Sequence, residues 1–165
     1  MADNKISAKD IVTYGGAAFA IFAMYKIAEK FGLIKSSEEQ QQQINLQNLQ
    51  TGGGSAQFGS FWNPNFWQNV AKQYGTATTI GTNVVNKLAD DIYDAISWYG
   101  DDETQIYGVF RALQYQSQIS FLAQVFKAKH DKDLYGFLQD HLSDDELNNI
   151  AVIVQNYPIT SKAKK

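Results

Sequence analysis

The chain of 165 residues contains no cysteine, only two prolines and only two histidines. The absence of cysteine excludes disulfides, thiolate nucleophiles and thiolate metal ligands, so stability has to come from packing. With so little proline and 13% aromatic residues, the composition favours long helices and a filled core over a sandwich of short strands. The sequence therefore predicts an all-α protein with one compact domain and appendages.

An excess of positive charge is also missing, since the formal net charge is -3. A protein that binds nucleic acid needs a basic track for the phosphates, so we expect no nucleic-acid partner. The only basic cluster lies at the end of the chain and consists of Lys162, Lys164 and Lys165. Residues 159–165 are accordingly predicted to be a solvated basic tail.

A run without any charged residue extends from Ile11 to Tyr25. As a helix it is about 22 Å long, and continuing it to Ile34 gives about 36 Å, which exceeds the ~30 Å hydrocarbon layer of a bilayer. The two lysines in this extension can reach the headgroups by snorkelling. We predict that residues 1–35 form a single-pass transmembrane helix, which places the protein in a membrane, cellular or viral. The anchor residues are Ile11, Val12, Phe19, Ile21, Phe22, Met24 and Tyr25.

Three alternatives remain for this run: a helix buried against protein, a signal segment, and a helix lying in the membrane interface. Small residues between Gly15 and Ala20 would let a second helix approach closely, which leaves a homo-oligomer open. The lipid bilayer is the expected partner in the transmembrane interpretation, and the identity of a protein partner cannot be read from the sequence.

Residues 36–64 form the predicted linker. Their first half, SSEEQQQQINLQNLQ, has a capping-box pattern at Ser36 and Glu39 but only a narrow apolar stripe, so it is either a helical stalk or a disordered tether. The glycines of TGGGS follow, which favour backbone flexibility. This segment is the best candidate for a domain boundary.

The linker runs into FWNPNFW, a segment with four large aromatic residues. In one interpretation it is a docking loop or an interfacial aromatic belt. In the other it is a lid over the hydrophobic core. The candidate interface residues are Phe61, Trp62, Phe66 and Trp67, together with Trp98 further along the chain.

Apolar residues at helical spacing predict a helical domain over residues 65–158. Five helices are expected: one long helix from Val70 to Gly100, a second capped by Asp101 or Asp102, a third over Gln116–Lys129, a fourth from Asp131, and a fifth opened by Ser143 and Glu146. The two histidines, His130 and His141, are expected on the surface near helix ends.

Part of this domain resembles one repeat of the annexin family. The similar stretches are AISWYGDDE at Ala95–Glu103, FKAKHDKDL at Phe126–Leu134 and FLQDHLS at Phe137–Ser143. They correspond to the family's G-x-G-T-D-E loop, its K-x-x-x-G-x-D-L segment and its D-L-K-x-E-L segment, with one extra residue between the second and third helices. The resemblance covers less than half of the chain and implies a five-helix bundle.

In annexins, as the resemblance implies, calcium binds carbonyls of the glycine loop and an acidic side chain near the end of the fourth helix, and bridges to phospholipid. The two loop glycines fall at Trp98 and Gly100, and the acidic ligand falls at His141. Trp98 prevents close backbone approach, and a neutral imidazole is a poor ligand for calcium. We therefore expect the fold to carry over without the calcium site, and predict neither a metal nor another cofactor.

No catalytic residue is predicted. The acidic clusters at Asp90–Asp91, Asp101–Glu103 and Asp144–Glu146 could in principle pair carboxylates for acid–base work, but the two triplets lie at predicted helix starts, where acids stabilise the helix dipole. Serines lack a nucleophile-elbow context, and GGGS lacks the residues of a P-loop. We predict a non-enzymatic, membrane-anchored structural or scaffolding protein whose helical domain docks on partner proteins. With a small N-terminal anchor and abundant Asn, Gln and Tyr, the chain also resembles structural proteins of membrane-containing bacterial viruses.

The alternative function is peripheral phospholipid binding through the annexin-like repeat. In that hypothesis Trp98 inserts into the membrane interface, and calcium dependence is doubtful for the reasons just given.

Overall fold

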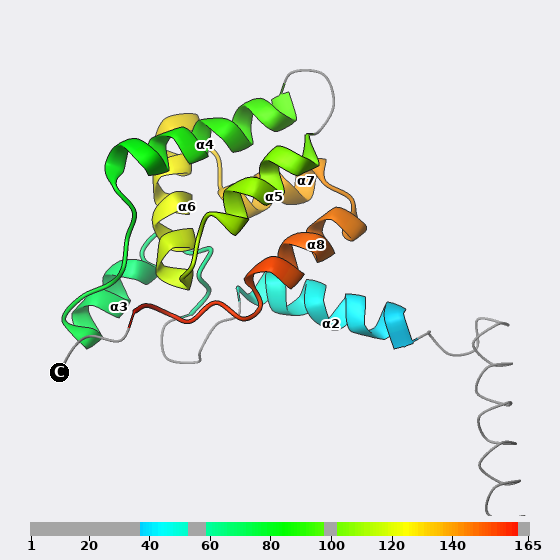
Figure 1. Cartoon of the computed structure of the whole chain (residues 1–165), viewed down its shortest axis with the longest axis horizontal. Helices are drawn as coiled ribbons and strands as arrows, with labels where there is room; N and C mark the ends of the chain where they lie inside the picture. Colours follow the sequence, from blue (N-terminus) through cyan, green and yellow to red (C-terminus); the bar gives the residue numbers. More distant parts are fainter. Residues whose placement is uncertain (1–36, 53–58, 98–101, 162–165) are drawn as a thin grey trace, which may run out of the picture. The chain divides into compact units, whose positions relative to one another are not determined.

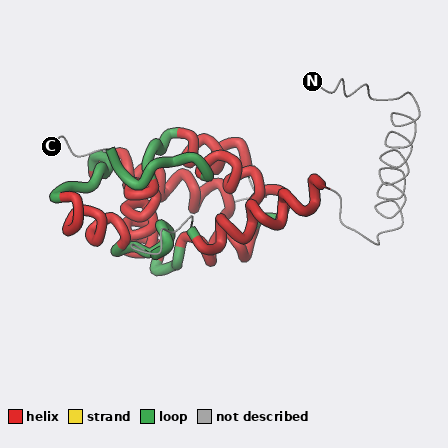
Figure 2. Tube along the Cα trace, turned by 90° about the horizontal axis from the view of Figure 1, so that it is seen from below, coloured by secondary structure: helices red, strands yellow, loops and turns green. Residues whose placement is uncertain are grey.

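The computed structural model describes residues 37–52, 59–97 and 102–161, which form seven α-helices and no strand (Figures 1 and 2). This confirms the all-α prediction for the described part of the chain. None of its helices is long and apolar enough to cross a bilayer. The predicted anchor, Ile11 to Tyr25, and Trp98 lie outside the described residues. The helices are α2 (Ser37–Thr51), α3 (Phe66–Tyr74), α4 (Thr82–Ser97), α5 (Glu103–Arg111), α6 (Gln116–His130), α7 (Leu134–His141) and α8 (Asp144–Val154).

The chain divides into two compact units, Met1–Gln41 and Gln42–Lys165. Only the first turn of α2 is described in the first unit, where Glu38 and Glu39 are exposed and stabilise the helix start by their charge. All further description concerns the second unit.

Three of its helices begin at side-chain caps. The fourth predicted helix begins at Leu134 and not at Asp131, because Asp131 takes the left-handed conformation that ends α6. The Asp102 side chain accepts a hydrogen bond from the Gln105 backbone N–H at 3.0 Å, and the Asp133 side chain accepts one from Gly136 at 2.8 Å. At α8 the capping box predicted at Ser143 and Glu146 is confirmed, because each side chain bonds the other residue's backbone N–H. Such caps satisfy N–H groups that have no partner within the helix.

Helix α6 packs against α3, α4 and α7, and in Figure 1 it runs between α4 above and α3 below. It is buried on more than one side, which is why its buried residues do not form a single stripe. Helix α5 packs against α4 and α8 and extends the core away from α6. The largest fully buried side chains are Phe61, Phe66, Phe110, Phe126, Ile92, Ile106, Leu113, Ile119, Leu122, Leu134, Leu138 and Ile150.

The single long helix expected between Val70 and Gly100 is wrong, because α3 ends at Tyr74 and α4 begins at Thr82. Gly75 takes the left-handed conformation, with φ at 76°, and so ends α3. The connection that follows is held by the α6 residue Ser117, whose hydroxyl donates to the Thr78 carbonyl at 2.6 Å. The connection between α3 and α4 is therefore not helical, and a side-chain hydrogen bond fixes it to α6.

Residues 159–161 are part of the domain, beyond the predicted boundary at residue 158. The carbonyls of Pro158 and Ile159 accept hydrogen bonds from the backbone N–H groups of Gln116 and Ser117, at 2.9 and 3.0 Å. These N–H groups are at the start of α6 and have no partner within the helix. Residues 159–161 thus differ from the predicted solvated tail.

The linker prediction also needs correction over part of its length. Residues Gln42–Thr51 of α2 belong to the compact unit, as do residues 59–64. Gln42 donates to Asp145 at 2.6 Å and Asn45 donates to Asn148 at 3.0 Å, so α2 and α8 run side by side in the same direction (Figure 1). The weak apolar stripe of α2 was misleading because polar side chains make these contacts.

Candidate functional site

The structure places three of the predicted interface residues in the core. Phe61, Trp62 and Phe66 are 2%, 5% and 0% exposed. An exposed docking loop made of these three side chains is therefore a wrong prediction, and the alternative interpretation as a lid over the core describes them. The physical reason is that burying such large aromatic side chains contributes a large part of a small domain's stability.

Trp62 connects several elements at once. Its indole N–H donates to the Leu49 carbonyl of α2 at 2.6 Å. Its ring stacks on Tyr135 of α7 with centroids 5.0 Å apart, and meets Phe110 of α5 edge-on at 6.0 Å. The residue therefore ties α2 to the centre of the helical domain.

Trp67 remains partly accessible. Its indole N–H donates to the Gln124 side chain at 3.0 Å, and its ring meets Phe121 edge-on at 5.4 Å, both on α6. Of the five predicted interface residues, Trp67 alone is both described and only half-buried. Trp98 lies outside the described residues, and its interface role stays a prediction.

The annexin-like ligand positions are only partly described. His141 is exposed at the end of α7, with its Nδ1 2.7 Å from the Phe137 carbonyl oxygen. Across residues 37–52, 59–97 and 102–161, no three His, Cys, Asp or Glu side chains gather in a way that could hold a metal ion. The relation to annexins remains a resemblance of sequence.

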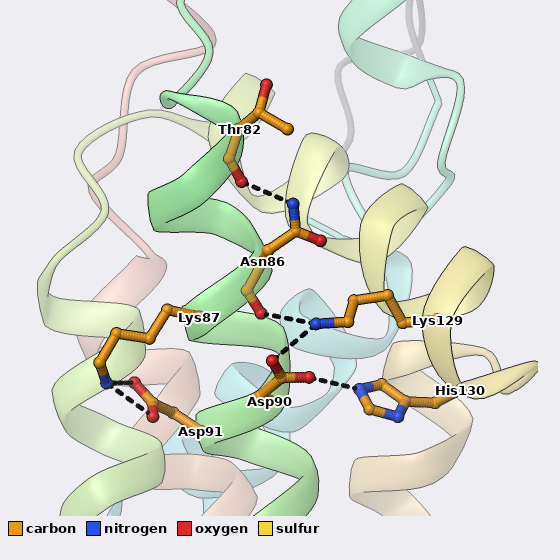
Figure 3. Close-up of polar contacts among 7 residues, drawn as sticks. All are labelled: Thr82, Asn86, Lys87, Asp90, Asp91, Lys129 and His130. Carbon is orange, nitrogen blue, oxygen red and sulfur yellow. Dashed lines mark hydrogen bonds and ion pairs between the residues drawn. The ribbon is translucent and has the colours of Figure 1, made fainter.

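A cluster of charged and polar side chains joins α4 to the end of α6, and Figure 3 shows it. Asp90 receives the ammonium group of Lys129 on Oδ2 at 2.6 Å, and the His130 Nε2 lies 3.5 Å from its Oδ1. Lys129 also donates to the Asn86 carbonyl at 3.3 Å. One carboxylate on α4 is therefore shared by two consecutive residues of α6.

His130 is more enclosed than expected, since its side chain is only 13% exposed. Its ring stacks on Tyr93 with centroids 4.1 Å apart and planes 3° from parallel. Burial lowers the pKa of His130 from the ordinary 6.5, while the charge of Asp90 opposes this change. The prediction of a surface histidine is wrong because Tyr93 of α4 and Phe126 of α6 pack against its ring.

Lys132 completes the cluster from the loop between α6 and α7. Its ammonium group lies 4.8 Å from the centre of the Phe137 ring and 5.6 Å from that of Tyr93. A cation over aromatic faces is a stabilising arrangement. The cluster as a whole fastens α4, α6 and α7 together, with an imidazole that can respond to protons.

The acidic residues beside it have structural partners as well. Lys87 and Asp91 form an ion pair at 2.6 Å one turn apart on α4 (Figure 3). Backbone and side-chain hydrogen bonds from Ser143 lower the pKa of Glu146 in the cap of α8. Asp102 caps α5 as described above. Asp90, Asp91, Asp102 and Glu146 therefore serve in caps and in ion pairs between or along helices.

Sequence reasoning missed the pairing of Asp90 with Lys129 and His130. Asp90 and Lys129 are 39 positions apart in the sequence. Their location on predicted helices was the only sequence signal, and it does not indicate that the two residues are paired. The sequence matches no family model, and comparisons with curated proteins and with solved structures returned no match.

Proposed function

We propose that this chain is a membrane-anchored structural or scaffolding protein, in a cellular or a virion membrane, whose helical domain docks on partner proteins. The observation that carries the proposal is the joining of two unlike parts in one chain. An uncharged apolar run, Ile11 to Tyr25, precedes a separate compact unit, Gln42–Lys165, that has its own hydrophobic core. Such a division suits a protein that holds a folded domain at a membrane.

The contacts of the described domain are consistent with a positioning role. Asp102 caps α5, Asp91 pairs with Lys87, and the pair of Asp90 with Lys129 fastens α4 to α6. Four large apolar side chains are substantially exposed, Ile44, Tyr74, Val84 and Val152. They lie on four different helices, and single exposed apolar residues are ordinary on protein surfaces. The proposed docking role therefore rests on the membrane anchor and not on an exposed apolar patch. The surface that contacts the partner is to be found by crosslinking.

Alkaline carbonate extraction of membranes from cells that express the chain tests the anchor. We expect the full chain to stay with the membrane pellet and a form lacking residues 1–35 to be released. Replacing Phe19 and Ile21 by aspartate should release the chain as well, because each charge at the centre of a span costs about 2.5–3.5 kcal/mol. Replacing the same residues by leucine is the matched control and should leave the chain in the pellet.

Release of the full chain by carbonate would refute the membrane anchor and leave an apolar helix packed on protein. The docking role needs a second measurement, which is crosslinking in the native membrane followed by peptide mapping. Crosslinks from residues 42–161 to one recurring partner support it. Crosslinks confined to residues 1–41 would show that the helical domain does not dock.

A further inference from the structure

The imidazole of His130 lies where α4, α6 and α7 meet. Its ring is stacked on Tyr93 of α4 and contacts Phe126 of its own helix, with centroids 4.1 and 4.9 Å apart. The same Tyr93 ring stacks on Phe137 of α7 at 5.6 Å. Tyr93 therefore contacts both the end of α6 and the first turn of α7, and the packing around His130 holds the three helices together.

The Nε2 atom of His130 is enclosed without a hydrogen bond. It is buried and has no hydrogen-bond partner among the described residues. The Asp90 Oδ1 is 3.5 Å away, while the other oxygen of this carboxylate accepts from the Lys129 ammonium group at 2.6 Å (Figure 3). A buried polar atom without a partner is rare in folded proteins. The fold thus keeps a proton-binding atom beside a carboxylate that is already paired.

The charges that act on the ring cancel only while it is neutral. Two carboxylates and two ammonium groups act on it, from Asp90 and Asp94 of α4, Lys129 of α6 and Lys132 of the loop that follows. Tyr93 contacts the ring through its uncharged aromatic face, and α7 adds the uncharged ring of Phe137. A proton on His130 would therefore leave one unbalanced positive charge on a side chain that is only 13% exposed.

Burial acts in the same direction as this charge balance. It lowers the pKa of His130 from the ordinary 6.5, and the charge of Asp90 opposes the change only in part. A state in which the ring reaches water therefore binds the proton more readily than the closed state does. By linkage, acid favours that state once the pH falls below 6.5.

The turn after α6 is where the backbone can move first. Asp131 ends α6 with φ at 52°, and it is the one non-glycine residue of the described ranges with a positive φ. Such a conformation is less favourable for a residue that has a side chain. Movement at this turn would take His130 and α7 away from Tyr93 without breaking a helix.

We propose that the junction of α4, α6 and α7 is an acid-operated latch. While His130 is neutral, the latch is closed. When the ring takes up a proton, the α6–α7 turn moves away from Tyr93, and the imidazolium reaches water at a greater distance from Lys129 and Lys132. Opening uncovers the Phe137 ring, which is only 4% exposed in the closed state. The latch does not depend on the proposed anchor or on the docking role.

Hydrogen–deuterium exchange of the full chain, read by mass spectrometry, tests the latch. The measurement covers about pH 5 to 8, the range in which histidine changes its charge, and gives protection factors, which remove the intrinsic pH dependence of amide exchange. We expect residues 127–141 to lose protection below pH 6.5 while residues 147–154 of α8 stay more protected at the same pH. Nuclear magnetic resonance of the imidazole protons should show His130 taking up its proton over the same pH interval.

Variants connect the loss of protection to one imidazole. His130→Gln cannot take up a proton, so the protection of residues 127–141 should no longer depend on pH. His141→Gln is the matched control, because it removes the chain's other histidine from an exposed position on α7. It should lose protection in acid as the unchanged chain does.

Should His130→Gln fail to fold, Lys132→Met provides the test, since Lys132 is exposed. Without this cation the protonation of His130 is opposed less. The ring should then titrate at a higher pH, and the acid-induced loss of protection should be smaller than in the unchanged chain.

Three results would overturn the latch. The first is a protection of residues 127–141 that stays constant over the whole pH range. The second is equal protection of residues 127–141 and 147–154 in acid, because the whole domain would then unfold at once. The third is an unchanged acid-induced loss of protection in His130→Gln or, if that variant does not fold, in Lys132→Met.

Discussion

Replacement of Trp62 tests how the aromatic segment holds α2 on the helical domain. In Trp62→Phe the ring stays but the hydrogen bond to the Leu49 carbonyl is lost. That carbonyl also accepts from the Gly52 N–H at 2.9 Å, so it keeps one partner. The lost bond then costs about 0.5–1.5 kcal/mol, to which the smaller ring adds a packing loss of about 1 kcal/mol. We expect a total of about 1–3 kcal/mol.

Trp62→Ala removes the ring contacts with Tyr135 and Phe110 as well. For a residue that is only 5% exposed, the expected cost is about 3–5 kcal/mol. The free energy of unfolding is measured by urea titration of the full chain, followed by far-ultraviolet circular dichroism. Trp67→Phe is the matched control, because its indole bonds a side chain near solvent, and it should cost less than about 1 kcal/mol.

Equal effects of Trp62→Phe and Trp67→Phe would refute the special role of the bond to Leu49. A cost below about 2 kcal/mol for Trp62→Ala would refute the buried packing itself.

Three further changes test other contacts of the domain. Ser120→Ala should cost about 1–3 kcal/mol in urea unfolding, because the buried hydroxyl donates to the Asn63 carbonyl and accepts from the Trp67 N–H; a loss below about 0.5 kcal/mol would contradict this. Ser143→Ala should cost about 1 kcal/mol by removing the cap of α8, and an unchanged unfolding midpoint would argue against the cap. The pKa of His130 is lowered in the folded state, so the unfolded chain binds the proton more readily and the free energy of unfolding should fall as the pH drops below 6.5. In His130→Gln the free energy of unfolding should depend less on pH in this range. An unchanged pH dependence would exclude His130 as its cause.

Local signals in the sequence predicted several elements correctly. The starts of α5 and α8 follow from Asp102 and from the Ser143–Glu146 capping box, because a cap depends on residues only a few positions apart. The extent of α6 followed from apolar spacing in the same way. These are interactions within one turn, which a single sequence reveals directly.

Features that depend on distant residues could not be predicted. Gly75 was the only sequence signal for the end of α3 after Tyr74. The connection that follows is held by the hydrogen bond from Ser117 to Thr78, and Ser117 comes about forty residues later. Whether Phe61 faced solvent or the core depended on helices that come later in the chain. The pairing of Asp90 with His130 likewise required the fold, since it does not involve neighbouring residues.

The start of α6 has a consequence for the order of events during synthesis. The carbonyls of Pro158 and Ile159 accept hydrogen bonds from its first N–H groups. Thr160 and Ser161 form hydrogen bonds with Thr78, which lies about eighty positions earlier in the sequence. The domain therefore cannot complete its hydrogen bonding until residue 161 has left the ribosome. Residue 34, the end of the proposed anchor, emerges roughly 6–25 s earlier at ~5–20 residues per second. Membrane insertion would thus precede folding, and the domain would close while already tethered.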